Sequence, residues 1–159
     1  MPLPPPGSRF PDIEVKDARG EPALLPRTDS IVAFFKTTCP TCELTWPYLE
    51  RLRRLAEGSG LSFAAVSQDR PELAADFQKR LGTHLPTFYD LEPWQASERA
   101  GLETVPTVFL LGEDGTIAQS LVGFQRAGLE GLAASAAKRG GRPGPLFGPG
   151  DEVPEVKPG

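Results

Sequence analysis

The only two cysteines of this chain stand together as Cys39-Pro40-Thr41-Cys42, directly after a strand-like apolar run at 31–35 and directly before a long helical pattern. A thiol at a helix N-terminus lies beside unpaired backbone N–H groups and the positive end of the helix dipole, which favour its thiolate form. The second thiol, three residues later, lies within reach of a disulfide. The arrangement predicts a dithiol that is reversibly oxidised and reduced.

Length and composition indicate one domain. A chain of 159 residues, 39% of them apolar, is long enough for a single packed core. The net charge of −4 and a pI near 5.1 argue against nucleic acid or an anionic membrane as the main partner. No run is long enough to insert in a membrane, and the first residues lack the apolar stretch of a signal peptide. We therefore expect a cytoplasmic protein, or a periplasmic or secreted one if an export leader has been removed.

Both ends of the chain have the composition of tails. Four of the first six residues are proline, and residues 140–159 hold six glycines and five prolines. Such segments bury too little apolar surface to offset the entropy of ordering. We expect a flexible N-terminal segment at 1–9, a folded domain at 10–139 and a disordered tail at 140–159.

The folded domain alternates strand and helix patterns, which predicts an α/β fold. A hairpin is expected within 10–25, and the continuous apolar run at 31–35 is typical of a strand buried on both faces. Helical patterns follow at 40–57, interrupted by Pro47, and, starting at Asp69 and Pro71, in a second helix with Leu73, Phe77 and Leu81 as the apolar stripe. Further expectations are strands at 61–66, 85–89 (short, at an edge), 107–111 and 117–122, with helices at 93–100 and around 129–136. The turn signal Asp114-Gly115 predicts that the last two strands form an antiparallel hairpin. Together they predict a central mixed sheet with helices on both faces and an N-terminal hairpin extension.

Three motifs in register resemble the thioredoxin superfamily. They are the Cys-x-x-Cys between strand and helix, Pro47 eight residues after the first cysteine, and Val105-Pro106-Thr107 before a strand. The opening Phe10-Pro11-Asp12-Ile13 and the stretch 66–90 are similar more specifically to the TlpA-like branch. The resemblance covers about residues 10–135 and implies a thioredoxin-like fold.

The resemblance also implies roles for individual residues. Cys39 is expected to attack a partner disulfide and Cys42 to resolve the mixed disulfide. Pro106 is expected to be a cis-proline, and Val105 to pair with substrate backbone. The expected substrate-binding residues are Val105, Pro106, Pro40 and Thr41.

The chain also departs from the family pattern. Ala33 stands where thioredoxins carry a buried acid six residues before the first cysteine. We therefore consider Lys36, whose cation would favour a thiolate, and Glu43, in the first helical turn, as pKa-tuning candidates. Gly123, at a strand end, permits close backbone approach and is a candidate partner contact.

The leading hypothesis is a cofactor-free thiol–disulfide oxidoreductase. It would exchange disulfides with protein partners through a mixed disulfide, in the reducing direction, supplied by an upstream thiol reductant. One alternative is a peroxiredoxin-like peroxidase, which Phe34-Phe35 and Cys39-Pro40-Thr41 faintly echo. Another is a copper-binding protein in which both thiolates and His84, the single histidine, hold the soft ion. A structural zinc site is not expected, because cysteine and histidine supply too few ligands.

Overall fold

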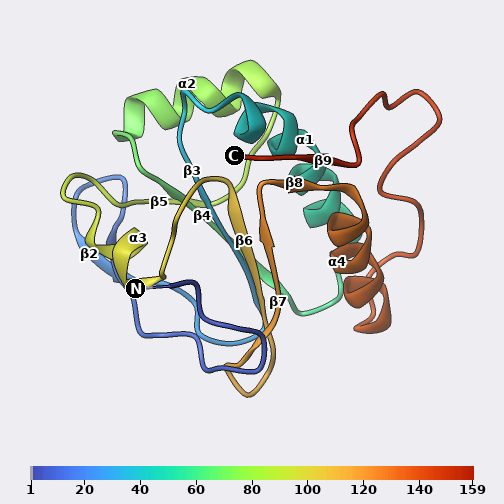
Figure 1. Ribbon diagram of the computed structural model, residues 1–159, viewed down its shortest axis with the longest axis horizontal. Coiled ribbons are helices and arrows are strands. Elements are labelled where there is room, and N and C mark those ends of the chain that lie inside the picture. The colour runs from blue at the N-terminus through green and yellow to red at the C-terminus, as the bar shows by residue number, and fades with distance from the viewer. Residues whose placement is uncertain (1) are drawn as a thin grey trace.

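A mixed seven-stranded sheet organises the computed structural model, which describes residues 2–159 (Figure 1). The strand order is β2-β1-β5-β4-β3-β6-β7, and a separate two-stranded sheet pairs β8 with β9. The strands are β1 (Glu14–Lys16), β2 (Pro22–Leu24), β3 (Ser30–Phe35), β4 (Ser62–Ser67), β5 (Thr87–Tyr89), β6 (Thr107–Leu111), β7 (Ile117–Val122), β8 (Phe124–Gln125) and β9 (Val156–Lys157). The helices are α1 (Pro40–Leu55), α2 (Pro71–Leu81), α3 (Gln95–Arg99) and α4 (Arg126–Lys138).

Strand β3 is the centre of the sheet. It pairs in parallel with β4 and antiparallel with β6, and all six of its residues are buried. The continuous apolar run predicted this burial on both faces. The expected antiparallel hairpin of β6 and β7 is confirmed, with Gly115 at a φ of 84° in its turn.

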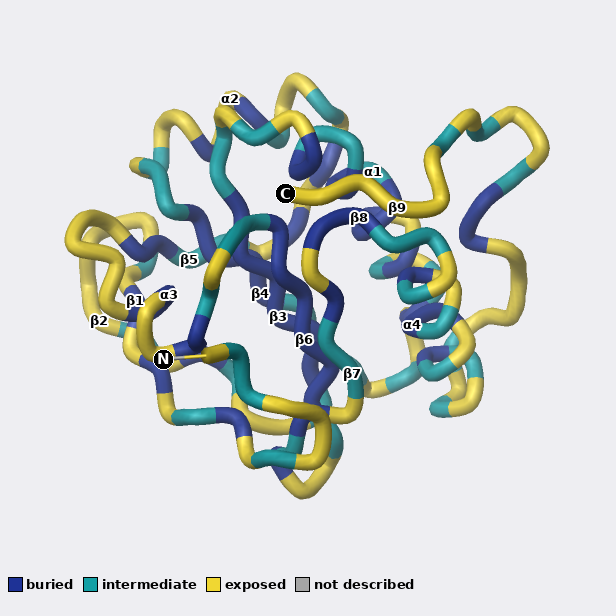
Figure 2. The backbone as a smooth tube through the Cα atoms, in the orientation of Figure 1, coloured by how far each residue is buried: buried dark blue, intermediate teal, exposed yellow. Residues whose placement is uncertain are grey.

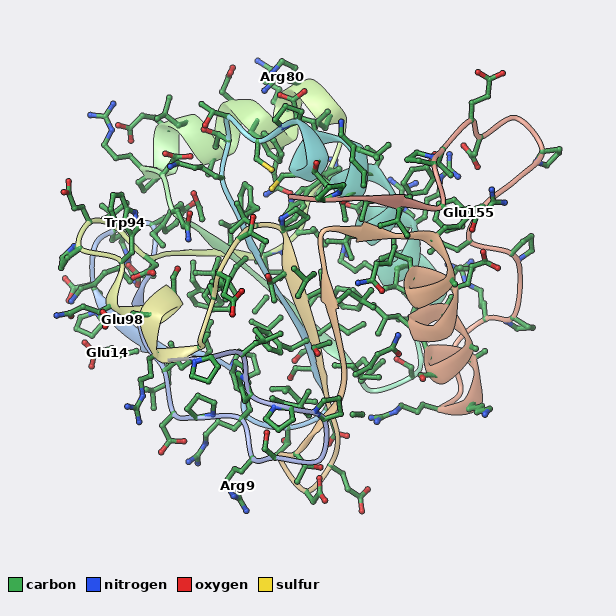
Figure 3. The ribbon with its side chains drawn as sticks, viewed as in Figure 1. Arg9, Glu14, Arg80, Trp94, Glu98 and Glu155 are labelled. Carbon is green, nitrogen blue, oxygen red and sulfur yellow. The ribbon has the colours of Figure 1, made fainter. Side chains whose placement is uncertain are left out.

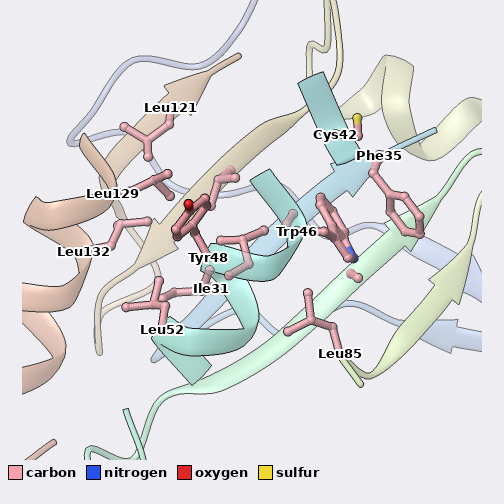
Figure 4. Packing of buried hydrophobic residues seen from close by; sticks show 14 of the residues in the cluster. Ile31, Phe35, Cys42, Trp46, Tyr48, Leu52, Leu85, Leu121, Leu129 and Leu132 are labelled. Carbon is pink, nitrogen blue, oxygen red and sulfur yellow. The ribbon is translucent and has the colours of Figure 1, made fainter. Parts of the chain in front are cut away.

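Alternate residues of β3 face two separate cores. Ile31, Ala33 and Phe35 belong to the cluster that contains side chains of α1, α2 and α4 (Figure 4). Val32 and Phe34 belong to the other cluster, with side chains of α3 and of the chain before β3. The prediction of helices on both faces is confirmed, but unevenly, because the five-residue helix α3 is the only helix on the second face among the described residues.

Two predictions about elements are wrong in detail. Strand β5 is not an edge strand, because the hairpin β1–β2 adds outside it through the pair Lys16–Tyr89. In α2, Leu73 is 43% exposed and Ala74 takes the buried position. Phe77 keeps its predicted buried position and packs against Phe35, with ring centroids 5.1 Å apart. With this packing, the buried stripe of the helix contains Ala74 in place of Leu73.

The N-terminal segment was expected to be flexible, and residues 2–9 are instead docked on the sheet; Met1 lies outside the described residues. The backbone N–H of Gly7 donates to the carbonyl oxygen of Ile117 (2.8 Å), and the backbone N–H of Ile117 donates to the carbonyl oxygen of Ser8 (2.8 Å). The expectation fails because a sheet edge offers unpaired backbone groups that even a proline-rich segment satisfies.

The expectation of a disordered tail at 140–159 is wrong too. Leu146 and Phe147 are buried, at 3% and 7% exposure. Figure 2 shows a buried stretch in the long loop that follows α4. The Phe147 ring lies 4.6 Å from that of Tyr48 between centroids. The Arg51 guanidinium pairs with the Asp151 carboxylate at 2.6 Å. Two buried side chains and one ion pair thus hold in place a segment whose average composition is typical of disordered chains.

Candidate active site

Cys39 caps the N-terminus of α1. Its backbone is extended, with φ −96° and ψ 113°, and its Sγ accepts a hydrogen bond from the backbone N–H of Cys42 at 3.1 Å. Pro40 follows at the start of the helix, where its missing N–H costs no hydrogen bond. Cys39 is half-buried and therefore accessible to a partner.

Cys42 lies one turn further along the same helix, and its environment is different. It is fully buried at 0% exposure, within the core cluster that contains Phe35 and Trp46 (Figure 4). Burial, followed by the contact with the Cys39 thiol, raises the pKa of Cys42 well above its ordinary value. Both thiols are free, so the structure is that of the reduced dithiol. Cys42 is therefore held as a protonated thiol behind an accessible one.

The loop before the dithiol is held by a carboxylate that the sequence analysis placed only at a helix start. Asp69 Oδ2 accepts from the backbone N–H of Thr37 (2.7 Å) and from its hydroxyl (2.8 Å). Asp69 itself follows β4, whose parallel partner β3 ends just before Thr37. The adjacent carboxyl ends of two parallel strands therefore fix the approach to Cys39.

The loop before β6 also contacts Cys39. The Val105–Pro106 peptide bond is cis, which confirms the expected geometry at Pro106. Pro106 is buried and Val105 is half-buried. The Cys39 thiol lies 3.5 Å from the carbonyl oxygen of Val105. The structure thus brings the dithiol and the Val105-Pro106 pair into one site; the substrate-binding role of that pair stays a prediction.

The two residues between the cysteines differ in exposure. Pro40 is exposed, whereas Thr41 is buried at 3%. The Thr41 hydroxyl donates to the carbonyl oxygen of Pro158 at 2.7 Å, so the last residues of the chain lie against the Cys-x-x-Cys turn. In Figure 1 the C-terminal end accordingly lies beside the start of α1. A direct contact of Thr41 with a partner therefore competes with this segment.

Both pKa-tuning candidates have other charged or aromatic partners. The Lys36 ammonium lies 5.8 Å from the centroid of the Trp94 ring, a cation–π arrangement. Glu43 lies 3.4 Å from the Arg80 guanidinium. The Glu43 charge contributes to the raised pKa of Cys42, and the desolvation of the thiol is the larger cause. Their tuning roles stay predictions.

An open pocket of about 410 Å³ adjoins the Val105 side of the site. Lys36, Gln68, Trp94 and Val105 contribute to its lining. The Trp94 indole N–H donates to the carbonyl oxygen of Gln68 at 3.2 Å, which ties the Trp94 side chain, labelled in Figure 3, to the residue that follows β4. The pocket lining thus combines an aromatic ring and a cation with Val105, the residue whose carbonyl oxygen lies beside Cys39.

The donors required for the copper alternative are not gathered at the dithiol. No group of three or more His, Cys, Asp or Glu side chains that could hold a metal occurs within residues 2–159. His84 is exposed, and its backbone N–H donates to the buried Glu50 carboxylate, which also pairs with Arg53.

Two features of the site escaped the sequence analysis. The first is Asp69, for which the only signal was its position after a buried strand. The second is the segment after Asp151, for which Leu146-Phe147 inside a Pro/Gly-rich stretch was the available signal. Gly123, predicted to permit close approach, does so at a φ of 72°: a Cβ there would lie 2.7 Å from the carbonyl oxygen of Lys157.

Comparison with known proteins gives one family match and a consistent set of relatives. The Redoxin family model matches residues 5–135. The thiol-disulfide oxidoreductase ResA of Geobacillus thermodenitrificans is 28% identical over 123 residues, which cover 74% of this chain and 69% of the relative. The protein of the same name from Halalkalibacterium halodurans is 29% identical over 106 residues, or 66% of this chain and 56% of the relative.

Solved structures with the same architecture confirm the thioredoxin-like fold. The thioredoxin domain of a thiol-disulfide oxidoreductase from Bacteroides vulgatus superposes with a TM-score of 0.70 at 20% identity, covering 85% of this chain and 97% of that one. StoA from Bacillus subtilis superposes with a TM-score of 0.62 at 21% identity, covering 79% and 96%.

Proposed function

Because the chain belongs to the Redoxin family, within the TlpA- and ResA-like part of the thioredoxin superfamily, we propose that this thiol–disulfide oxidoreductase reduces disulfides of protein partners through Cys39 and Cys42. One observation carries the proposal. Two free thiols lie in the first turn of one helix, one accessible and accepting a backbone N–H, the other buried with a raised pKa. That difference supports Cys39 as the attacking sulfur and Cys42 as the resolving one.

The proposed reaction conserves thiols and electrons. The Cys39 thiolate attacks one sulfur of the partner disulfide, which forms a mixed disulfide and expels the other partner sulfur as a thiolate. The Cys42 thiol then loses its proton to that thiolate or to water and attacks the Cys39 sulfur. The second partner sulfur leaves, so the partner gains two electrons and the enzyme retains a Cys39–Cys42 disulfide. An upstream dithiol returns it to the reduced state.

Ala33 leaves the second step without the family's buried acid. Glu43 is adjacent in sequence to Cys42, and its charge opposes deprotonation of that thiol. The resolving step is therefore expected to be slow until a partner sulfur enters and provides a proton acceptor.

The surface around Cys39 supports a polypeptide as the substrate. Val105 offers backbone beside the nucleophile, and Pro40 is exposed on the other side. The neighbouring pocket, with Trp94 and Lys36, has room for a partner side chain. Tryptophan is among the residues enriched where proteins recognise one another.

The direction of disulfide exchange depends on the redox potential of the Cys39–Cys42 pair relative to that of its compartment. No helix in residues 2–159 is long and apolar enough to cross a membrane. A cytoplasmic location stays a prediction, and it would favour the reducing direction.

The test is an equilibrium redox titration of the Cys39–Cys42 pair against glutathione or dithiothreitol buffers, with thiols counted by mass after alkylation. A single two-electron transition at or below about −230 mV supports a reductant, whereas one above about −180 mV supports an oxidase or isomerase. Cys42→Ser is the control that must not form an intramolecular disulfide. If the parent protein forms none at any potential, the proposed function is wrong.

A further inference from the structure

We propose that residues 151–159, named the strap, occupy the partner-binding surface beside Cys39, so that a disulfide-bearing protein must displace the strap before exchange begins. The inference rests on the proposed function for the identity of that surface. The inference adds that a segment of the chain itself competes with the partner for this surface.

The strap is anchored well away from the dithiol. Leu146 and Phe147 are buried against Tyr48 and Phe124 just before it begins. Asp151 then accepts two hydrogen bonds from the Arg51 guanidinium, at 2.6 and 3.1 Å, and one from the backbone N–H of Gly148 at 2.7 Å. These donors, the guanidinium first, lower the pKa of Asp151 to about 2. The carboxylate is therefore charged throughout the physiological range.

Beyond the anchor, the strap runs as an extended strand toward the site. Strand β9 pairs antiparallel with β8, with Val156 opposite Gln125 and Lys157 opposite Phe124. The Arg126 backbone N–H donates to the carbonyl oxygen of Glu155 at 2.9 Å, which extends the pairing by one residue. Val156 itself is 65% exposed, so the strand is held by backbone pairing and not by burial of its side chains.

The strap ends between the two loops that frame Cys39. Thr41, inside the Cys-x-x-Cys turn, donates its hydroxyl to the carbonyl oxygen of Pro158 at 2.7 Å. Gly159 packs against Val105 so closely that a Cβ on this glycine would lie 2.0 Å from the Val105 carbonyl oxygen. The Cys39 thiol lies 3.5 Å from that same oxygen. Backbone that a partner would pair with is thus already covered.

The geometry also says what the surface accepts. It binds extended backbone with a small residue against Val105, because the strap places Gly159 there and nothing larger fits. Beyond Asp151, the interactions of the strap are few: one side-chain hydrogen bond, one further backbone hydrogen bond and a short strand pairing. A tethered segment needs little intrinsic affinity, since its effective concentration is on the order of millimolar for a short flexible linker. The strap is therefore expected to be displaceable by a partner.

The experiment uses the full chain and two matched pairs of variants. Gly159→Leu introduces a side chain that cannot fit against Val105, while Gly150→Leu, whose Cβ would meet no atom within 4 Å, is its control. Asp151→Asn weakens the anchor, and Glu152→Gln makes the same change of charge at an exposed neighbour. Circular dichroism checks that each variant is folded.

The readout is the alkylation rate of reduced Cys39 with a bulky maleimide–polyethylene glycol and with the small reagent iodoacetamide. A strap that is docked two thirds of the time slows the bulky reagent by about threefold. We expect Gly159→Leu to restore this factor, Asp151→Asn to restore part of it, and both controls to match the parent; rates with iodoacetamide should differ much less. Equal rates with the bulky reagent for the parent, Gly159→Leu and Gly150→Leu would overturn the proposal.

Reduction of insulin by the same proteins separates the two proposals. Faster alkylation together with faster insulin reduction supports both. Faster alkylation without insulin reduction by any form leaves the strap in place as a cover of Cys39 and overturns the proposed function alone.

Discussion

Cys39 and Cys42 belong to the same turn of one helix, yet their surroundings are opposite. Cys39 is half-buried and accepts the N–H of Cys42 at 3.1 Å, whereas Cys42 has 0% exposure and a raised pKa. The difference arises because Cys39 is the N-cap, with extended backbone, whereas Cys42 lies inside the helix and packs in the core. The helix N-terminus thus makes two chemically identical groups unequal, and the proposed order of the reaction rests on this inequality.

The strongest test of this inequality removes each sulfur in turn. Cys39→Ser should reduce exchange with a protein disulfide to the uncatalysed rate, because the accessible thiolate is lost. Cys42→Ser should retain the first attack and accumulate a mixed disulfide with the partner. Mass spectrometry after acid quenching measures both. Equal accumulation of mixed disulfide in the two variants would contradict the assignment.

The next test follows the thiols with pH. Because the pKa of Cys42 is raised, its thiolate fraction should fall about tenfold for each unit below that pKa, so Cys42 should stay unmodified near neutral pH after Cys39 is labelled. The measurement is differential alkylation followed by peptide mapping. Peroxide consumption that persists in Cys42→Ser would instead revive the peroxidase alternative.

The same shift makes a prediction about stability. A pKa that is higher in the folded than in the unfolded protein means that folding favours the protonated Cys42. Its contribution is fully present below the ordinary thiol pKa and is lost as the pH rises through the folded-state pKa. Urea unfolding of the reduced protein should therefore show decreasing stability above about pH 9. Cys42→Ala should remove this dependence.

A smaller effect is expected at the loop before Cys39. Asp69→Ala removes the carboxylate oxygen that accepts both Thr37 hydrogen bonds and should cost about 1 to 2 kcal/mol of unfolding free energy. The alkylation rate of Cys39 should change, while Cys42 stays unreactive. Asp76→Ala, at an exposed position of α2, is the matched control. An effect of the same size in both variants would remove the positioning role of Asp69.

The smallest effect is expected at Glu43. Glu43→Gln should lower the pKa of Cys42 only slightly, because the side chain is half-buried, pairs with Arg80 and is a minor cause of the shift. The pH profile of Cys42 alkylation measures it, with Glu113→Gln as the exposed control. A rise in pKa would reverse the sign argued from the structure.

Sequence patterns predicted the part of the fold that local physics determines. The buried run of β3, the Asp114-Gly115 turn and the placement of Cys39 at a helix start are confirmed, because each depends on neighbours in the sequence. The cis geometry at Pro106 came from the family resemblance and not from the residues alone.

What the sequence could not predict depends on distant contacts. Leu146 and Phe147 are only two apolar residues among glycines and prolines. Their contribution to the core is evident only once their packing beside Tyr48 is known. Asp69 looked like the start of a helix, and its bond to Thr37 joins residues 32 positions apart. The burial of Ala74 in place of Leu73 likewise depends on how α2 packs against Phe35.

The N-terminal residues docked on β7 have a consequence for how copies of the protein meet. Strand β7 is one edge of the seven-stranded sheet, and Gly7 and Ser8 already pair with the backbone of Ile117. The opposite edge, β2, is only three residues long and begins with Pro22, which has no N–H to offer. The short border strand β2 and the first residue of β7 are therefore blunted against edge-to-edge aggregation. A tag or fusion that pulls residues 7–9 away would free the backbone groups of Ile117 and lengthen the border that is open to another chain.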